Sequence, residues 1–318
     1  MSERPGVRPL EHEAQTGEEA RAGEESGPPA RRSRRSGWRR PLRWTAIALA
    51  LALVVLVGWA ALPRGPDEDR FTTVFENPRV AVGQGDGYLR LTPEGEEPVR
   101  GVVFYPGARV APASYAATWA PVVAEAGVAV FIPAMPLNFA VLDIDRADEV
   151  IAAEDTIESW IVGGHSLGGA MASSHLGRRA EATAEGHAAT DGPAAVDRIE
   201  GLVLWGGYPT EGAELAARDD LAVLSVAGGR DGLTTTADVR QRRHLLPDDA
   251  DVVVIDGMNH AQFGAYGDHW RDGEALISDG EAADELAEVT ASWLAERSSR
   301  RRPPRRRSRA PRTGRSRR

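Results

Sequence analysis

The chain has 318 residues, of which 42% are hydrophobic and 27% charged, and this length allows one large domain or two small ones. The apolar content excludes a wholly disordered chain, and the absence of cysteine excludes a disulfide framework or a thiolate metal site. The formal net charge of −9 is unevenly distributed, because residues 64–296 are acidic while residues 1–43 and 297–318 are rich in arginine. Phosphate repels an acidic body, so we expect no nucleic-acid partner.

Both ends of the chain have the composition of disordered tails. Residues 1–43 lack an apolar period, and residues 297–318 hold 12 arginines and no acidic residue. Such an arginine-rich tail either binds an anionic envelope polymer or lipid surface, or is simply a solvated end. The sequence leaves both alternatives open.

An uncharged apolar segment follows the first tail. Residues 45–62 carry no charge and would span roughly 27 Å as a helix, close to the ~30 Å thickness of a bilayer's hydrocarbon core. Trp44 and Trp59 lie near its ends, where indole rings favour the membrane interface. We therefore predict a single transmembrane signal anchor over residues 44–63.

The flanking charges predict the orientation of this anchor. Seven arginines lie within residues 31–43, and acidic residues follow the segment, so the N-terminus is expected in the cytoplasm and the body from residue 64 outside. A cleaved signal peptide is the second reading, although the apolar run is longer than the usual ~7–15 residues. A buried core helix fits least, because the segment is apolar on every face.

The body, residues 64–296, alternates short β-rich runs with helix-length stretches. This pattern predicts an α/β fold with a mostly parallel central sheet and helices on both faces. We expect antiparallel edge strands within residues 71–91 and a surface loop over residues 181–198. The remaining strands are expected at residues 102–105, 128–132, 159–162, 202–205, 221–226 and 252–255, and helices at 114–126, 168–179 and 281–297.

A nucleophile motif lies between a predicted strand and a predicted helix. Residues 164–168 read Gly-His-Ser-Leu-Gly, which fits G-x-S-x-G. Small residues on both sides of Ser166 are needed because the flanking chains nearly touch at such a turn. Ser166 is therefore the candidate nucleophile, and His165 is expected to be structural or to line the pocket.

A serine nucleophile needs a base and an acid that orients the base, and in this fold class they follow in the order Ser, Asp/Glu, His. Asp231 follows the predicted strand at 221–226, and His260 follows the strand at 252–255. We predict the triad Ser166, Asp231 and His260. The rival acid is Glu211 and the rival base is His269, while Asp256 is expected only to end its strand.

An oxyanion hole requires two N–H donors aimed at the acyl oxygen. One is expected from Leu167, directly after the nucleophile. The other is expected from the loop after the strand at 102–105, where Gly107 allows the backbone to turn and Ala108 or Arg109 would donate. No cofactor is required, and no metal site is expected.

Five stretches of the body resemble the α/β-hydrolase superfamily, and in particular an uncharacterised, often membrane-anchored branch similar to dienelactone hydrolases and small esterases. They are FYPGARV at 104–110, IPAMPLNFAVLD at 132–143, VGGHSLGGAMA at 162–172, AGGRDGLT at 227–234 and GMNHAQFGAYG at 257–267. The resemblance implies hydrolysis but no particular substrate. Ser166 stands where dienelactone hydrolases use cysteine.

Three functions compete at this stage. The first is a membrane-anchored serine hydrolase that cleaves carboxylic esters or related acyl groups of a small-molecule substrate. The second is an acyltransferase of the same fold that uses an envelope alcohol in place of water. The third is a non-catalytic envelope-binding protein, which would leave the triad pattern unexplained.

Overall fold

The computed structural model describes residues 39–184 and 198–299. Seven α-helices are described in these ranges, and the chain divides into two compact units at a boundary between Ala52 and Leu53. The helices are α1 (Arg39–Ala61), α2 (Glu68–Glu76), α3 (Ala116–Ala126), α4 (Arg146–Ala153), α5 (Leu167–Ala184), α7 (Thr236–Gln241) and α8 (Asp279–Ser299).

An eight-stranded sheet forms the centre of the body, with strand order β1-β2-β4-β3-β5-β6-β7-β8. Strand β2 pairs antiparallel with β1 and β4, and the pairings from β4 through β8 are all parallel. The strands are β1 (Val80–Gly85), β2 (Tyr88–Pro93), β3 (Arg100–Tyr105), β4 (Ala129–Pro133), β5 (Ser159–His165), β6 (Ile199–Trp205), β7 (Ala222–Gly228) and β8 (Asp251–Ile255). The predicted α/β fold with a mostly parallel sheet is confirmed.

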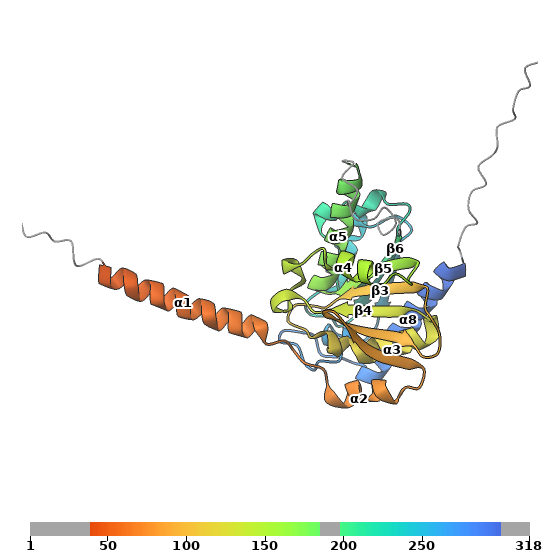
Figure 1. Ribbon diagram of the computed structural model, residues 1–318, viewed down its shortest axis with the longest axis horizontal. Helices are drawn as coiled ribbons and strands as arrows, with labels where there is room; N and C mark the ends of the chain where they lie inside the picture. Colours follow the sequence, from red (N-terminus) through yellow and green to blue (C-terminus); the bar gives the residue numbers. More distant parts are fainter. Residues whose placement is uncertain (1–38, 185–197, 300–318) are drawn as a thin grey trace, which may run out of the picture. The chain divides into compact units, whose positions relative to one another are not determined.

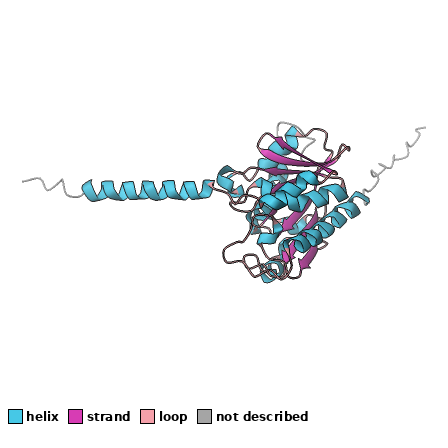
Figure 2. Cartoon of the chain, turned by 90° about the horizontal axis from the view of Figure 1, so that it is seen from below, coloured by secondary structure: helices cyan, strands magenta, loops and turns pink. Residues whose placement is uncertain are grey.

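Helices cover both faces of the sheet (Figures 1 and 2). Alternate residues of β3 point to opposite faces, so Val102 and Phe104 join the core beneath α3 and α8, whereas Val103 and Tyr105 join the core beneath α4 and α5. All six residues of β3 are buried, as expected for a central parallel strand. The parallel strands bring their carboxyl ends, and the loops that follow them, to one edge.

The predicted start of the edge strands is wrong, because residues 71–76 belong to α2. Asp67 caps this helix by accepting a hydrogen bond of 3.0 Å from the Arg70 N–H. Phe71 and Val74 lie three residues apart on one helix face, and Val74 is buried in the core. The antiparallel pair itself exists, as β1 and β2.

Two other boundaries also differ from the expectation. Helix α5 continues to Ala184 through a stretch rich in alanine, so the start of the predicted loop at 181–198 is helical. Residues 185–197 of that loop lie outside the described residues. Helix α1 begins at Arg39 and α8 ends at Ser299, and the remainder of both predicted tails is also outside the described residues.

The apolar segment of α1 is long and apolar enough to cross a membrane. Residues Leu42–Ala61 have a mean hydropathy of 2.2, and only 6% of this stretch is buried. Such exposure differs from that of a core helix, which would bury its apolar side chains. The finding is consistent with a single-pass anchor.

An aromatic cluster supports the face of the sheet beneath α3. The rings of Trp119 and Trp205 stack with centroids 4.5 Å apart, and Phe104 packs against both. All three side chains are fully buried. The cluster therefore joins α3 to strands β3 and β6.

Replacing Trp119 with alanine is expected to lower the free energy of unfolding by about 3–5 kcal/mol, because the substitution leaves a cavity between α3 and the sheet. Chemical denaturation of the detergent-solubilised chain followed by circular dichroism measures this loss. The matched change Trp270→Ala removes an exposed indole and should change the same free energy by no more than about 0.5 kcal/mol. Equal losses in the two variants would contradict the assignment.

Candidate active site

Ser166 lies at the turn between β5 and α5, with a positive φ of 54°. The turn is closely packed by glycines. A Cβ on Gly164 would lie 2.6 Å from the Gly168 carbonyl oxygen, and a Cβ on Gly168 would lie 2.5 Å from the Pro106 carbonyl oxygen. Both glycines of the motif are thus required by backbone contact, and Ser166 is held in a strained conformation at the carboxyl edge of the sheet.

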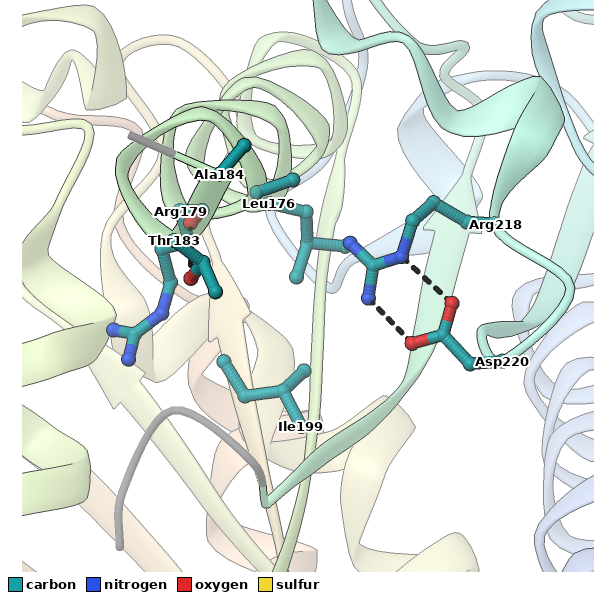
Figure 3. Close-up of a pocket in the computed structure, with 8 residues that line it drawn as sticks. Leu176, Arg179, Thr183, Ala184, Ile199, Arg218 and Asp220 are labelled. Atoms are coloured by element: carbon teal, nitrogen blue, oxygen red, sulfur yellow. Dashed lines mark hydrogen bonds and ion pairs between the residues drawn. The ribbon is translucent and has the colours of Figure 1, made fainter. Parts of the chain in front are cut away.

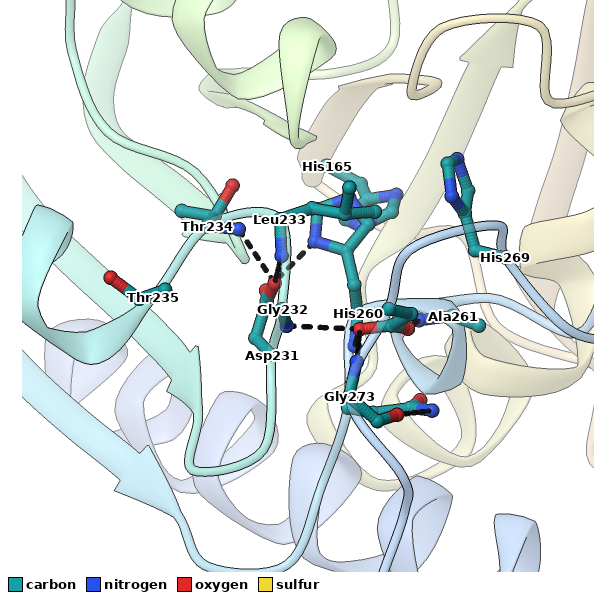
Figure 4. A network of polar contacts seen from close by, with 12 residues as sticks. His165, Asp231, Gly232, Leu233, Thr234, Thr235, His260, Ala261, His269 and Gly273 are labelled. Atoms are coloured by element: carbon teal, nitrogen blue, oxygen red, sulfur yellow. Dashed lines mark hydrogen bonds and ion pairs between the residues drawn. The ribbon is translucent and has the colours of Figure 1, made fainter.

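Asp231 and His260 are joined by a buried hydrogen bond. His260 Nδ1 lies 2.7 Å from Asp231 Oδ2, and both side chains are almost completely excluded from solvent (Figure 4). Because the ionised carboxylate can only accept, the imidazole donates from Nδ1. Nε2 of neutral His260 is then left as an acceptor, which is the tautomer that a general base requires.

The Asp231 carboxylate is also held by its own loop. Its Oδ1 accepts hydrogen bonds from the N–H groups of Leu233, at 2.8 Å, and Thr234, at 2.6 Å. These donors fix the orientation of the carboxylate and leave Oδ2 for the imidazole (Figure 4). Asp231 therefore has hydrogen-bond partners for both carboxylate oxygens.

Asp272, which the sequence did not single out, connects the acid and base loops. Its Oδ1 accepts from Gly232 N–H at 3.0 Å and from His260 N–H at 3.1 Å, and its Oδ2 accepts from Ala261 N–H at 2.8 Å. The carboxylate thereby holds the backbone of residue 232 beside that of residue 260. An Asp-Gly pair in a long loop is a common turn sequence, so no signal marked this role.

Close packing brings the nucleophile turn near the other two residues. A Cβ on Gly207 would lie 3.0 Å from the Ser166 carbonyl oxygen, while a Cβ on Gly206 would lie 3.2 Å from Asp231 Oδ2. The neighbouring pair Gly206 and Gly207 thus contacts Asp231 on one side and Ser166 on the other. The structure brings together all three residues of the predicted triad at one edge of the sheet.

The rival residues take other positions. The ring of His269 lies 5.8 Å from that of His260, and its Nδ1 bonds to the Trp270 carbonyl oxygen, so its partner is not Asp231. Glu211 begins a short 3-10 helix and is exposed. Asp256 is exposed in the turn after β8. The carboxylate that contacts His260 Nδ1 is that of Asp231.

His165 packs against His260 of the predicted triad. Its ring is buried, lies 4.4 Å from the ring of His260, and shares a hydrogen bond of 2.9 Å between Nδ1 and the Tyr115 hydroxyl. Burial, and then the proximity of His260 and His269, lower the pKa of His165 well below its usual value. His165 is therefore neutral at pH 7 and supports the site from behind.

The loop after β3 lies against the start of α5, through the contact of Gly168 with Pro106. Within this loop, the Gly107 N–H donates to the Tyr115 hydroxyl and the Arg109 N–H donates to the Asn138 carbonyl, both at 2.8 Å. Among the described residues, no hydrogen bond is recorded for the Ala108 N–H. Of the two predicted alternatives, this arrangement favours Ala108 over Arg109 as the partner of Leu167 in an oxyanion hole.

Apolar residues near these loops differ in their burial. Met258 and Phe263 are fully buried within the core beneath α3 and α8, so they are core residues. Leu137 is 40% exposed. Within residues 39–184 and 198–299, no group of three or more His, Asp or Glu side chains is arranged to hold a metal ion.

A pocket of about 600 Å³ lies elsewhere, between the second half of α5 and the start of β6. Leu176, Arg179 and Ile199 contribute to its wall, and Arg218 pairs with Asp220 beside it (Figure 3). Ile199 opens a parallel strand, so this pocket is at the edge opposite Ser166. It is not the pocket of the candidate active site.

Comparison with known proteins identifies the family to which the chain belongs. A model of the alpha/beta hydrolase family matches residues 101–284, which is more than half of the chain, so the protein belongs to the alpha/beta hydrolase family. It is therefore a hydrolase by family. No curated protein matches the chain.

Solved structures of similar fold include several esterases. An esterase from Pyrobaculum calidifontis shares 14% identity and a TM-score of 0.49, covering 72% of this chain and 89% of its own. The esterase domain of a Rhodothermus marinus protein shares 11% identity and a TM-score of 0.47, covering 68% and 97%. A dienelactone hydrolase-like protein from Klebsiella pneumoniae shares 14% identity and a TM-score of 0.45, covering 68% and 99%.

We expect Asp272→Ala to lower kcat for a p-nitrophenyl ester on the order of 10²-fold with a smaller change in KM, because small displacements of a catalytic group are that costly. It should also weaken the downfield proton resonance of the His260 Nδ1–H, which reports its bond to Asp231. The matched control is Asp256→Ala, which removes an exposed carboxylate from the preceding turn. Unchanged kcat and resonance in Asp272→Ala would contradict the positioning role.

His165 should make the folded state sensitive to acid. Its pKa is lower in the folded chain than in the unfolded chain, so below about pH 6.5 the unfolded chain binds a proton that the folded chain does not. The contribution of His165 to the free energy of unfolding is fully present above that pH. It is lost as the pH falls, by up to about 1.4 kcal/mol per pH unit. Urea denaturation between about pH 5 and pH 8 measures the free energy of unfolding at each pH. This free energy should depend less steeply on pH in His165→Gln than in the wild type. The same pH dependence in both proteins would rule out a contribution from His165.

Proposed function

We propose that the protein is a serine hydrolase that cleaves carboxylic esters through Ser166, His260 and Asp231. The observation that carries the proposal is the buried 2.7 Å hydrogen bond between His260 Nδ1 and Asp231 Oδ2, beside a strained serine turn. A buried histidine oriented by a carboxylate, next to a serine in such a turn, is the arrangement that activates a hydroxyl for acyl transfer.

In the first half of the reaction, Ser166 Oγ attacks the acyl carbonyl carbon while His260 Nε2 takes the hydroxyl proton. The N–H groups of Leu167 and Ala108 hold the oxyanion of the tetrahedral intermediate. Asp231 keeps the imidazole oriented and stabilises its protonated form. The intermediate then expels the alcohol, which receives the proton from His260, and leaves an acyl-enzyme on Ser166.

In the second half, water replaces the alcohol. His260 Nε2 takes a proton from the water as its oxygen attacks the acyl-enzyme, and the same two N–H groups hold the second oxyanion. Collapse releases the carboxylic acid and returns the proton to Ser166 Oγ. An alcohol acceptor would yield a new ester by the same steps, so product analysis separates hydrolysis from acyl transfer.

The proposal extends to the location of the enzyme. Helix α1 would serve as a single-pass anchor with the N-terminus in the cytoplasm and the hydrolase body outside, because arginines precede the apolar segment and acidic residues follow it. Binding of an anionic envelope polymer or lipid by residues 297–318 stays a separate prediction, motivated by their 12 arginines.

A fluorophosphonate probe is expected to label the detergent-solubilised full chain. It should not label Ser166→Ala, which lacks the nucleophile, or His260→Ala, which lacks the base. Ester hydrolysis should fall by on the order of 10⁴-fold or more in Ser166→Ala, since the nucleophile is removed. The matched control is Ser174→Ala on the same helix, where the hydroxyl bonds to the Ala170 carbonyl and Thr210, and it should keep the label. A folded wild type that is neither labelled nor active would overturn the proposal.

A further inference from the structure

The segment that follows the apolar helix is hydrogen-bonded to the loop proposed to form the oxyanion hole. The Arg64 N–H donates to the Arg109 carbonyl at 2.5 Å, and the Ala111 N–H donates to the Arg64 carbonyl at 2.9 Å. Arg64 and Val110 thus form a parallel bridge. Arg64 is only three residues beyond the end of α1, so almost no free linker separates the helix from the loop that holds Ala108.

The same segment is joined to the loop that carries the base. Arg64 Nη1 donates to the Asp268 carbonyl at 2.8 Å, and the Asp67 N–H donates to the Ala265 carbonyl at 2.7 Å. Residues 265–268 follow His260 within one loop. Residues 64–67 therefore lie between the oxyanion loop and the histidine loop and are bonded to both.

The last turn of α1 contacts this edge as well. The boundary between the two compact units falls after Ala52, so Trp59, Ala60 and Leu62 belong to the same unit as the hydrolase body. The Arg109 guanidinium lies 3.8 Å from the centre of the Trp59 ring and donates to the Leu62 carbonyl at 2.8 Å. Asn138 Nδ2 donates to the Ala60 carbonyl at 3.1 Å. The end of the apolar segment is thus in contact with the loops that follow β3 and β4.

Exposed apolar side chains gather on the loops at this edge. Leu137, Val141 and Leu142 follow β4, and Trp270, which is 76% exposed, follows His260. The Arg271 guanidinium lies 5.1 Å from the Trp270 ring, a second tryptophan–arginine pair in addition to that of Trp59 and Arg109. Indole rings favour the membrane interface, and arginine can pair there with anionic headgroups. The edge is therefore suited to rest on a lipid surface.

We propose that the active site works at the membrane surface and takes acyl esters that reside in the bilayer. This inference rests on the function proposed above and specifies its substrate class. Because the last residues of the apolar segment contact the loops that follow β3 and β4, a membrane that holds this segment would lie beside the edge of the sheet that carries Ser166. Ester bonds at the level of the lipid headgroups are then presented at high effective concentration, without the lipid leaving the bilayer.

The main test separates the anchor from the site in the full chain, reconstituted in phosphatidylcholine vesicles. A Gly/Ser insert of about 12 residues between Leu62 and Pro63 adds roughly 20 Å of flexible reach. Hydrolysis is measured with water-soluble p-nitrophenyl acetate and with 4-methylumbelliferyl oleate dissolved in the same vesicles. The insert should reduce oleate hydrolysis at least tenfold and change acetate hydrolysis less than twofold.

The matched control places the same insert between Gly95 and Glu96. This exposed turn follows β2, which runs antiparallel to its neighbours, so it lies at the opposite edge of the sheet. Both activities should be unchanged there. Equal retention of oleate hydrolysis in the two insertion variants would overturn the inference, whereas a wild type that fails to hydrolyse even acetate would overturn the proposed function itself.

A second pair of variants tests the apolar edge without an insertion. Leu142→Ser combined with Trp270→Ser should lower oleate hydrolysis several-fold and leave acetate hydrolysis unchanged. The control combines Phe75→Ser with Val99→Ser, which removes exposed apolar side chains that precede β1 and β3 at the other edge. Equal effects of the two double variants on oleate hydrolysis would contradict a lipid-facing catalytic edge.

Discussion

The left-handed backbone of Ser166 is the constraint on which the rest of the site depends. A non-glycine residue in this conformation costs on the order of 1–3 kcal/mol, so it persists only where its surroundings hold it firmly. Here the Ser166 N–H donates to the Trp205 carbonyl at 3.0 Å, and Gly164 and Gly168 admit the neighbouring backbones. Strands β3, β5 and β6 must therefore be in register before Ser166 can adopt its position. The geometry of the Ser166 turn therefore depends on the same strand pairing that stabilises the centre of the sheet.

Backbone N–H groups hold Asp231 and the loops that carry the candidate acid and base. Asp231 accepts from two N–H groups of its own loop, and Asp272 accepts from N–H groups of both catalytic loops. Hydrogen bonds to ionised carboxylates are short and strong, so they can order loops that have little regular structure. The consequence is a His260 whose tautomer is defined by its neighbours before any substrate is bound.

Local patterns in the sequence were enough to predict the parallel sheet and to select Ser166, Asp231 and His260. Each of these three follows a strand whose apolar run is visible, and parallel strands bring their ends to one edge. The roles of Asp272, Asn138 and Tyr115 could not be predicted, because each bonds to backbone in a different loop and leaves no periodic signal.

The incorrect edge strand over residues 71–76 has a related cause. Its aromatic and β-branched residues fit a strand, but the Asp67 cap and the burial of Val74 in the core favour α2. Local propensity was overridden by a tertiary contact and a cap.

One edge of the sheet carries both the candidate active site and the attachment of the apolar helix. The direction of the parallel strands brings the nucleophile, acid and base loops to that edge, and Arg64 joins it by pairing with Val110. The pocket beside Ile199 and the exposed Val99 lie at the opposite edge. Residues 64–67, which follow the apolar helix, are bonded to the loops after β3 and β8, so the end of this helix and the candidate active site share one edge of the sheet.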